Sequence, residues 1–407
     1  MLFRSAKVLL TYISIVHAIS HIHIMTLPAL LPILPKAINV SFMELGIAIG
    51  VFNVVSLLVQ APFGFLVDRL GARKMLIYAL LLGTVSFTLV FISTSYISLI
   101  VAMALAGVAN GVYHPANYAL LSTGILTKQM GRAFSIHTFS GFFGAAIPPL
   151  MMIGIGMTFG INWAFALAAV ISFVGLLLML NLSQIHIQPR QHDKKQQYFH
   201  AEVRPHAIHF STIAILTLFF TLLSLSTGAI EKFSVSSLID GLHIDLNTAN
   251  YALTAFMFSG AFGVLAGGII ADKVQHHSAF AATAFGSAAL VLIIIICIPM
   301  SALALVASFA CAGFLMGVIA PSRDMLVRKA SPVGAEGRTF GIVSTGFNLG
   351  GVIGPLIFGF LLDKKLAIGV MWLAVIFILL TVVIIFIQEV MNKKIQKFSL
   401  DYKMYSK

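Results

Sequence analysis

The feature that most constrains this chain is a series of twelve long apolar runs with almost no charge inside them. Each run is long enough for an α-helix to cross the hydrocarbon core of a bilayer, which takes about 20 apolar residues. Only 9% of the 407 residues are charged, whereas a soluble domain has roughly 25%. We therefore predict an all-α membrane protein with about twelve transmembrane helices. The runs cover residues 8–33, 42–66, 74–94, 97–122, 133–157, 162–182, 208–236, 247–271, 278–298, 301–326, 338–361 and 366–388.

The cysteine and motif content excludes several other classes of protein. Cys297 and Cys311 are the only cysteines, and both lie inside apolar runs, which excludes a disulfide framework and a cysteine-based metal site. The sequence contains no phosphate-binding G-x-x-x-x-G-K-[S/T] motif, zinc-protease motif or nucleophile elbow, so it favours neither an ATP-driven pump nor an enzyme. The first apolar run lacks a signal-peptide cleavage pattern, so we expect it to remain as the first span. We expect no cofactor and no metal.

The basic residues are concentrated on one side of the predicted membrane. Of the 25 lysines and arginines, all but Lys36, Lys232, Lys364 and Lys365 lie in alternate loops or at the helix ends beside them. By the positive-inside rule, the basic side is cytoplasmic and carries both termini. The net charge of +12 therefore indicates orientation in the membrane rather than a nucleic-acid partner. Together with the short loops, it predicts a multi-pass protein of a bacterial cytoplasmic (inner) membrane.

One polar, histidine-rich stretch, residues 183–207, interrupts the series after the sixth run. Its histidine spacings match no compact zinc-ligand set, so we interpret it as a cytoplasmic linker whose basic residues face lipid headgroups. It divides the chain into an N-terminal six-helix bundle at 1–182 and a C-terminal six-helix bundle at 208–407 that ends in a cytoplasmic tail.

The two halves of the chain contain the same unit. When the sequence is shifted by 206 residues, residues 106–150 align with 312–356 without a gap. Two parallel six-helix repeats are a known plan of transporters, in which the substrate binds between the halves near the middle of the membrane. Scaffolds are also duplicated, so the repeat favours transport without proving it. The aligned pairs are Gly107 with Gly313, Gly111 with Gly317, Pro115 with Pro321, Gly131 with Gly337, Arg132 with Arg338, Phe134 with Phe340, Gly144 with Gly350 and Pro149 with Pro355.

The loop between the second and third runs reads Gly64-Phe-Leu-Val-Asp68-Arg69-Leu-Gly71-Ala-Arg73-Lys74. It resembles the signature loop of the major facilitator superfamily, with alanine at position 72, which is usually basic. A degenerate copy, Gly268-Ile-Ile-Ala-Asp272-Lys273, follows the eighth run. With the twelve spans and the repeat, the resemblance covers nearly the whole chain, and it implies the major facilitator fold and secondary transport.

The same resemblance implies a conformational latch on the cytoplasmic side. In the family, the loop aspartate contacts the start of the eleventh span, so Asp68 would meet that span near Gly337-Arg338, and Asp272 would meet the start of the fifth span near Gly131-Arg132. A carboxylate can accept hydrogen bonds from a helix N-terminus, and glycines permit close helix approach and a sharp turn. The alternative is that this loop only sets the orientation of the chain in the membrane and forms a tight turn. The predicted latch comprises Gly64, Asp68, Arg69, Gly71, Arg73, Arg132, Asp272 and Arg338.

A narrower resemblance is to the fosmidomycin-resistance branch of this superfamily. It rests on Leu27-Pro28-Ala-Leu-Leu-Pro32, on Gln60-Ala-Pro62 and on Tyr113-His114-Pro115-Ala116. In that branch, acidic residues follow an asparagine of the first span and the His-Pro pair, whereas His21 and Ala116 take those places here. The resemblance implies efflux, and the departures leave the substrate and the coupling chemistry open.

Ionisable residues inside a span are costly and therefore indicate function. In the family, spans one, four, seven and ten line the cavity. His17 and His21 lie four residues apart on one face of the first span, and an imidazole with a reference pKa of about 6.5 can carry a coupled proton. Neutral histidines bonded across a helix interface are the alternative. His23 lies on another face, where we favour that alternative.

Glu231 is the only glutamate that we place within a transmembrane run, near the outer end of the seventh span. It is a candidate for binding the coupled proton. Because Lys232 follows it directly, the pair may instead be read as a marker of the membrane surface.

Asn110, His114 and Asn117 form a narrow polar stripe on the fourth span, with Tyr113 at its edge. We predict that these four residues contact the substrate, with hydrogen bonding between helices as the alternative. The repeat aligns Asn117 with Arg323, whose guanidinium suits a carboxylate or phosphate. Arg323 is therefore a fifth substrate-binding candidate, or else an anchor that extends to the cytoplasmic surface.

These observations predict a monomeric, proton-coupled transporter in the lipid bilayer that exports a small amphiphilic or anionic organic compound by alternating access. Uptake of an organic acid or another metabolite is an alternative in the same class. A non-transporting membrane sensor or assembly partner is an alternative from another class, although such a protein would need a larger soluble surface than residues 183–207 provide.

Overall fold

The structure is a computed structural model. It describes residues 2–125, 130–181, 210–271, 277–323 and 345–405, together with residues 274, 327, 342 and 343. Twelve helices within these ranges are long and apolar enough to span a membrane, which confirms the predicted all-α membrane fold. The proposed linker 183–207, Asp272 and Arg338 lie outside the described residues.

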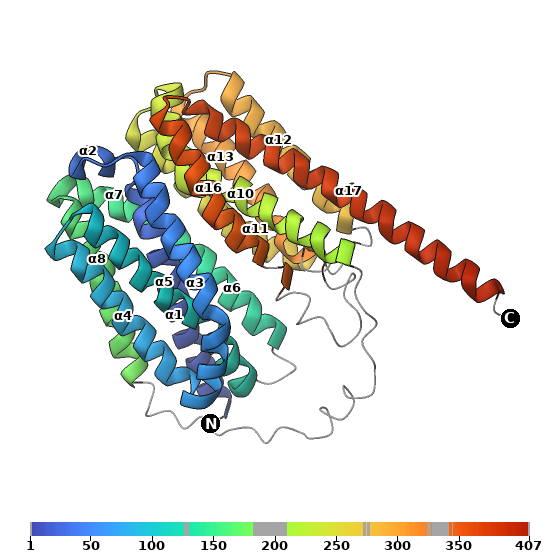
Figure 1. The fold of residues 1–407 in the computed structure, drawn as a ribbon, viewed down its shortest axis with the longest axis horizontal. Helices are drawn as coiled ribbons and strands as arrows, with labels where there is room; N and C mark the ends of the chain where they lie inside the picture. Colours follow the sequence, from blue (N-terminus) through green and yellow to red (C-terminus); the bar gives the residue numbers. More distant parts are fainter. Residues whose placement is uncertain are drawn as a thin grey trace.

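The helices follow one another along the chain with short connections. The first half forms α1 (Leu2–Leu30), the short α2 (Leu34–Ile38), α3 (Phe42–Leu70), α4 (Ala72–Ile92), α5 (Tyr96–Gly124), α6 (Met130–Ala146), α7 (Pro148–Phe159) and α8 (Ile161–Asn181). The second half forms α10 (Phe210–Leu242), α11 (Leu246–Ala271), α12 (His277–Cys297), α13 (Ala302–Val318), α16 (Thr345–Asp363) and α17 (Ile368–Tyr405). Each half forms a bundle, and the two bundles lie side by side (Figure 1).

Three spans differ from their predicted form. The fifth span is two helices, α6 and α7, that meet at Ile147, because the two prolines that follow lack backbone N–H donors. The seventh span continues to Leu242, ten residues beyond Lys232. The last helix runs on to Tyr405 and projects beyond its bundle (Figure 1), so the predicted tail is largely helical.

The packing of the helices repeats between the two halves. The fourth span packs on the second as α5 on α3, and the tenth packs on the eighth as α13 on α11. Gly107 and its counterpart Gly313 make both contacts possible, because a Cβ at either position would collide with the backbone of the facing helix. Ser95 and Ser301, which are also 206 residues apart, cap the N-termini of α5 and α13 with their hydroxyls.

The bundles contact each other mainly through α3 with α16 and through α6 and α7 with α11. At the end that carries α2, both carboxylate oxygens of Asp363 accept hydrogen bonds, from the backbone N–H groups of Phe42 and Met43, at 2.8 Å each. Further along the same pair of helices, the Asn53 amide donates to the carbonyl oxygen of Gly351 at 3.0 Å. These bonds close one end of the interface between the bundles.

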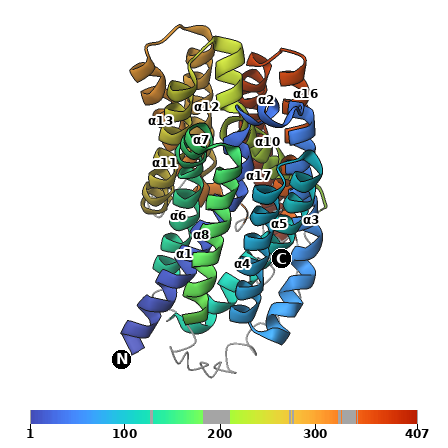
Figure 2. The ribbon, with the colours of Figure 1, turned by 90° about the vertical axis from the view of Figure 1, so that its left-hand side faces the viewer.

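A second closure lies on the other side of the interface. The amide of Asn250 in α11 donates to the carbonyl oxygen of Pro149 at 2.6 Å. The N-terminus of α11 is capped by a residue of its own bundle, because Asp245 accepts a hydrogen bond from the Thr248 backbone N–H. The hydrogen bonds from Thr248 lower the pKa of this exposed carboxyl. The N-terminus of the chain lies at the opposite end of the molecule from α2 (Figure 2).

Candidate functional site

Four histidines from three helices of the first bundle meet inside it. This histidine cluster consists of His17 and His21 of α1, His114 of α5 and His137 of α6. The ring of His17 stacks on that of His137, with centroids 3.8 Å apart and planes inclined by 13°. It meets the rings of His21 and His114 edge-on, at 4.7 Å and 5.5 Å. The predicted pair His17 and His21 is therefore part of a larger group.

One tautomer follows from the hydrogen bonding of His17. Its Nδ1 lies 2.7 Å from the backbone carbonyl oxygen of His137, and because a carbonyl only accepts, Nδ1 carries the proton. In the neutral ring Nε2 is then an acceptor, and it is buried without a hydrogen-bond partner. Both ring nitrogens of His137 are also buried and unpartnered. The cluster therefore holds basic nitrogens that are open to a proton or to a donor on a ligand.

Gly141, one turn beyond His137 on α6, makes the space for these rings. A Cβ at this position would lie 2.6 Å from Cε1 of His17 and 2.9 Å from Nε2 of His21. Both distances are far inside van der Waals contact, so any larger residue would displace an imidazole. The glycine is thus part of the site although it has no side chain.

The cluster can hold one positive charge far more easily than two. Two imidazolium ions at the 4.7 Å spacing of His17 and His21 would repel each other by about 3.5 kcal/mol at an effective dielectric constant of ~20. No aspartate or glutamate occurs in α1, α5, α6, α7 or α8, so no carboxylate from these helices offsets that repulsion.

His137 was not among the residues predicted from the sequence. It occupies an apolar span, so the rule that selects intramembrane ionisable groups would have found it. Its contact with His17 was not visible, because the two residues are 120 positions apart. The ring of His23 packs on Phe87 with centroids 4.8 Å apart and is not part of the cluster.

The predicted polar stripe of α5 divides into separate environments. Asn110 donates to the hydroxyl of Ser56 in α3 at 2.8 Å, which matches the interhelical alternative. His114 belongs to the histidine cluster. Tyr113 and Asn117 are almost fully buried, and neither the tyrosine hydroxyl nor the Asn117 amide has a hydrogen-bond partner. Residues that form one stripe by sequence spacing therefore have different partners in the structure.

Arg323 lies against two aromatic rings of its own bundle. Its guanidinium carbon is 5.4 Å from the ring centroid of Phe220 in α10 and 5.3 Å from that of Phe347 in α16, within the range of cation–π attraction. The 206-residue shift places Phe347 on Gly141 and Arg323 on Asn117.

Glu231 is half-buried in the middle of α10 rather than at its end. The helix continues for almost three turns beyond it, so the pair with Lys232 does not mark the end of the span. Lys232 is its immediate charge partner.

The signature loop has a local structural role in the first bundle. Gly71 has φ = +91°, a conformation that favours glycine at the turn between α3 and α4. Arg73 donates to the carbonyl oxygens of Met179 and Leu180, at 3.1 and 2.9 Å, and so caps the C-terminus of α8. A Cβ at Gly64 would meet no atom within 4 Å, so close packing at this glycine stays a prediction. Asp68, Arg69 and Arg132 are exposed.

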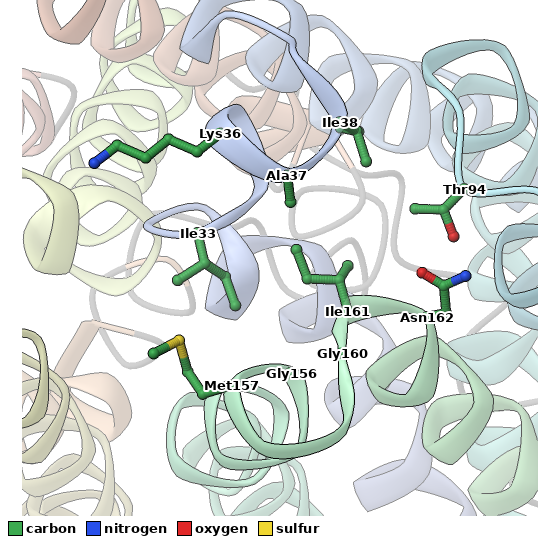
Figure 3. Close-up of a pocket in the computed structure, with 10 residues that line it drawn as sticks. All are labelled: Ile33, Lys36, Ala37, Ile38, Thr94, Gly156, Met157, Gly160, Ile161 and Asn162. Carbon is green, nitrogen blue, oxygen red and sulfur yellow. The ribbon is translucent and has the colours of Figure 1, made fainter.

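A pocket of about 630 Å³ lies at the α2 end of the first bundle, and none of the four histidines lines it (Figure 3). Lys36, Thr94 and Asn162 supply its polar side chains. Among the residues that the structure places, no three His, Cys, Asp or Glu side chains are arranged to hold a metal ion.

Comparisons with known proteins match most of the chain. The family model described as Major Facilitator Superfamily matches residues 13–230 and 213–399. The fosmidomycin resistance protein of Escherichia coli is 23% identical over 296 residues, which cover 72% of this chain and 71% of that protein. The multi-drug resistance efflux pump PmrA of Streptococcus pneumoniae is 25% identical over 316 residues, covering 76% of this chain and 77% of that pump.

The fold also matches solved structures. A bacterial homolog of the human lysosomal transporter Spinster, solved in an inward-facing and occupied conformation, superposes with a TM-score of 0.73 at 13% identity. The match covers 93% of this chain and 96% of that one. At this identity the likeness concerns the fold alone.

Proposed function

Because this chain belongs to the major facilitator superfamily, we propose that it is a proton-coupled secondary transporter that exports a small amphiphilic or anionic organic compound by alternating access. The observation that carries the proposal is the histidine cluster, four ionisable rings inside a membrane-spanning bundle. Groups of this kind are costly in a membrane and serve transport of protons or ligands. The resistance and efflux proteins among the relatives support export.

The proposed working cycle follows from where the bundles touch. The hydrogen bonds of Asp363 and Asn53 hold the bundles together at the α2 end, which the distribution of basic residues assigns to the outside. Asp68 and Arg132 are exposed at the other end. In the opposite state, Asp68 would engage the start of the eleventh span and close the cytoplasmic side, as its signature loop implies.

A second candidate function is the uptake of an organic anion with protons. It is favoured by Arg323, which presents a guanidinium among aromatic rings, and by the lack of acidic residues in the helices that form the histidine cluster. A guanidinium recognises carboxylate and phosphonate groups through its planar fork of donors.

The experiment that tests the main proposal is a resistance panel. The chain is overexpressed in an efflux-deficient bacterium, which is challenged with diverse toxic organic compounds including phosphonates. Each protected case is repeated with Asp68→Asn at equal membrane abundance. Tolerance that the variant loses supports export and the latch together. If the cells gain tolerance to none of the compounds, export of those compounds is rejected. Uptake is then tested by measuring proton flux in liposomes.

A further inference from the structure

We propose that the histidine cluster takes up its proton together with the negative charge of an anionic organic ligand, so that proton and anion move through the protein in the same direction. The inference rests on the second candidate function, uptake of an organic anion with protons, because protons that cross together with an anion drive it in the direction of their own gradient, into the cell. It adds the residues at which proton and anion meet and the number of protons bound with each anion. It follows from which groups surround the cluster.

The ionisable neighbours of the imidazoles at short range are one another and Tyr118 of α5, whose phenol ring lies 6.0 Å from those of His114 and His137. The charges that act on His17 are those of His21, His137 and His114, and those that act on His21 are His114 and His137. All of these groups are neutral or positive. A proton that enters the cluster therefore adds a positive charge with no negative partner beside it.

The other helices packed on this region do not supply the missing charge. α1 contacts α5, α6, α7, α8 and α10. The first four contain one charged residue, Arg132, which is exposed and basic. α10 carries Glu231, whose charge partner is the adjacent Lys232. α11, which packs on α6 and α7, has no charged residue between Leu246 and Ala271. Within the described part of the chain, the acidic groups of α3 are Glu44 and Asp68, near its two ends.

Unpartnered polar atoms next to the cluster favour a ligand rather than a proton alone. Nε2 of His17, both ring nitrogens of His137 and the Asn117 amide are buried without hydrogen bonds. Buried polar groups are normally satisfied, because an unsatisfied group costs free energy. A carboxylate, sulfonate or phosphonate would accept from a protonated ring and from an amide N–H, and it would also supply the negative charge.

The pseudo-equivalent place in the second bundle also suits an anion. Under the 206-residue shift, Phe347 replaces Gly141 and Arg323 replaces Asn117. The guanidinium of Arg323 lies over the adjoining rings of Phe220 and Phe347. The positions aligned with His114 and His137 are Ala320 and Val343, so the two halves would offer an anion different groups, imidazoles in the first and a guanidinium in the second.

This arrangement determines how proton and substrate are coupled. A ligand anion and a proton that attract each other bind cooperatively, and the cooperativity is reciprocal. They then cross together, which is symport. A cationic ligand would be repelled by the protonated cluster, so it would compete with the proton and exchange against it.

The test measures protons taken up during ligand binding to the purified full-length protein. The probes are benzoate and toluenesulfonate, which remain monoanions between pH 6 and pH 8, and tetraphenylphosphonium as the cation. Calorimetry in buffers of different ionisation enthalpy counts the protons. We expect uptake of about one proton per bound anion and an affinity that rises towards tenfold for each pH unit lowered, as linkage requires for one shared proton. We expect no uptake with the cation.

The variants are His17→Gln and His21→Gln, with His23→Gln as the matched control on the same helix. The first two variants should lose the proton uptake, whereas the control should keep it. Thermal unfolding shows whether each variant is folded. If only one of the two cluster variants folds, that variant alone decides the test. Anion binding without proton uptake, uptake that survives in a folded cluster variant, or failure of both anions to bind between pH 6 and pH 8 would overturn the inference. A positive resistance panel alongside any of these results leaves export, the main proposed function, standing, because the binding test addresses only the joint uptake of proton and anion.

Discussion

The side chain of Asp363, the last residue of α16, accepts a 2.8 Å hydrogen bond from the backbone N–H of Phe42, the first residue of α3. Its second oxygen accepts from the next N–H, that of Met43. The next backbone N–H, that of Glu44, donates to the Ser41 hydroxyl, and the Ser41 N–H donates to the Glu44 carboxylate, so these two residues form a capping box. The N-terminus of α3 is therefore capped half by its own chain segment and half by the other bundle.

We predict that Asp363→Asn favours the state in which the bundles part at the α2 end. The amide loses the charge and one of the two acceptor oxygens, at a cost of about 1 kcal/mol that is typical of a lost helix cap, equivalent to roughly a fivefold change in population. Spin labels at Pro35 and Asp240, which line one cavity from opposite bundles, would report a larger fraction of long distances. Asp245→Asn is the matched control, because that carboxylate caps α11 within one bundle. Equal distance distributions in both variants would contradict the prediction.

We predict that Gly141→Ala abolishes most proton-coupled transport. The added methyl group would lie 2.6 Å from the His17 ring, and relief of such overpacking costs about 1–3 kcal/mol, so the imidazoles must move. Proton flux in liposomes should fall about tenfold at equal protein incorporation. Gly154→Ala in α7 is the control, since a Cβ there meets nothing within 4 Å. An active Gly141→Ala protein would remove the close-packed cluster from the mechanism.

We predict that Arg323→Lys impairs the binding of anionic compounds more than that of neutral ones. Lysine keeps the positive charge but loses the planar fork and the stacking on Phe220 and Phe347. The affinity for benzoate should fall by about tenfold, as expected for the loss of about 1.4 kcal/mol, while a neutral aromatic amide should be affected little. Similar losses for both ligands would remove Arg323 from anion recognition.

We predict that Arg73→Gln destabilises the first bundle. The variant loses the bonds to the carbonyl oxygens of Met179 and Leu180, each worth about 1 kcal/mol. The thermal unfolding temperature in detergent should drop by several degrees. Arg69→Gln serves as the control for stability, because Arg69 is exposed. Unfolding at the wild-type temperature would show that the cap on α8 contributes little.

The number of spans and the duplication were predictable from the sequence. Each span is encoded locally, because a helix in lipid must satisfy its backbone by itself and must be apolar along about 20 residues. The repeat aligned Gly107 with Gly313, and the structure gives both the same kind of close helix contact. The break at Ile147 could have been anticipated from the two prolines beside it, whereas the extension of α10 from residue 236, the predicted end of the run, to Leu242 could not be read from hydropathy.

The candidate site was predicted only in part. His17 and His21 are neighbours on one helix, so their spacing was sufficient to join them. Asn110 and His114 also share a helix face, yet Asn110 bonds to α3 while His114 joins the histidines. The difference depends on how α5 is rotated against α1 and α3, which no local pattern specifies.

The sequence by itself therefore determined the fold class, the twelve spans, the repeat and the turn at Gly71. Only the tertiary structure decided that His137 stacks on His17, that Arg323 lies against two phenylalanine rings, and that Asp363 caps a helix of the other bundle. The physical reason is that hydropathy and backbone hydrogen bonding act within a helix, whereas the partners of a polar side chain depend on the packing of all the helices around it.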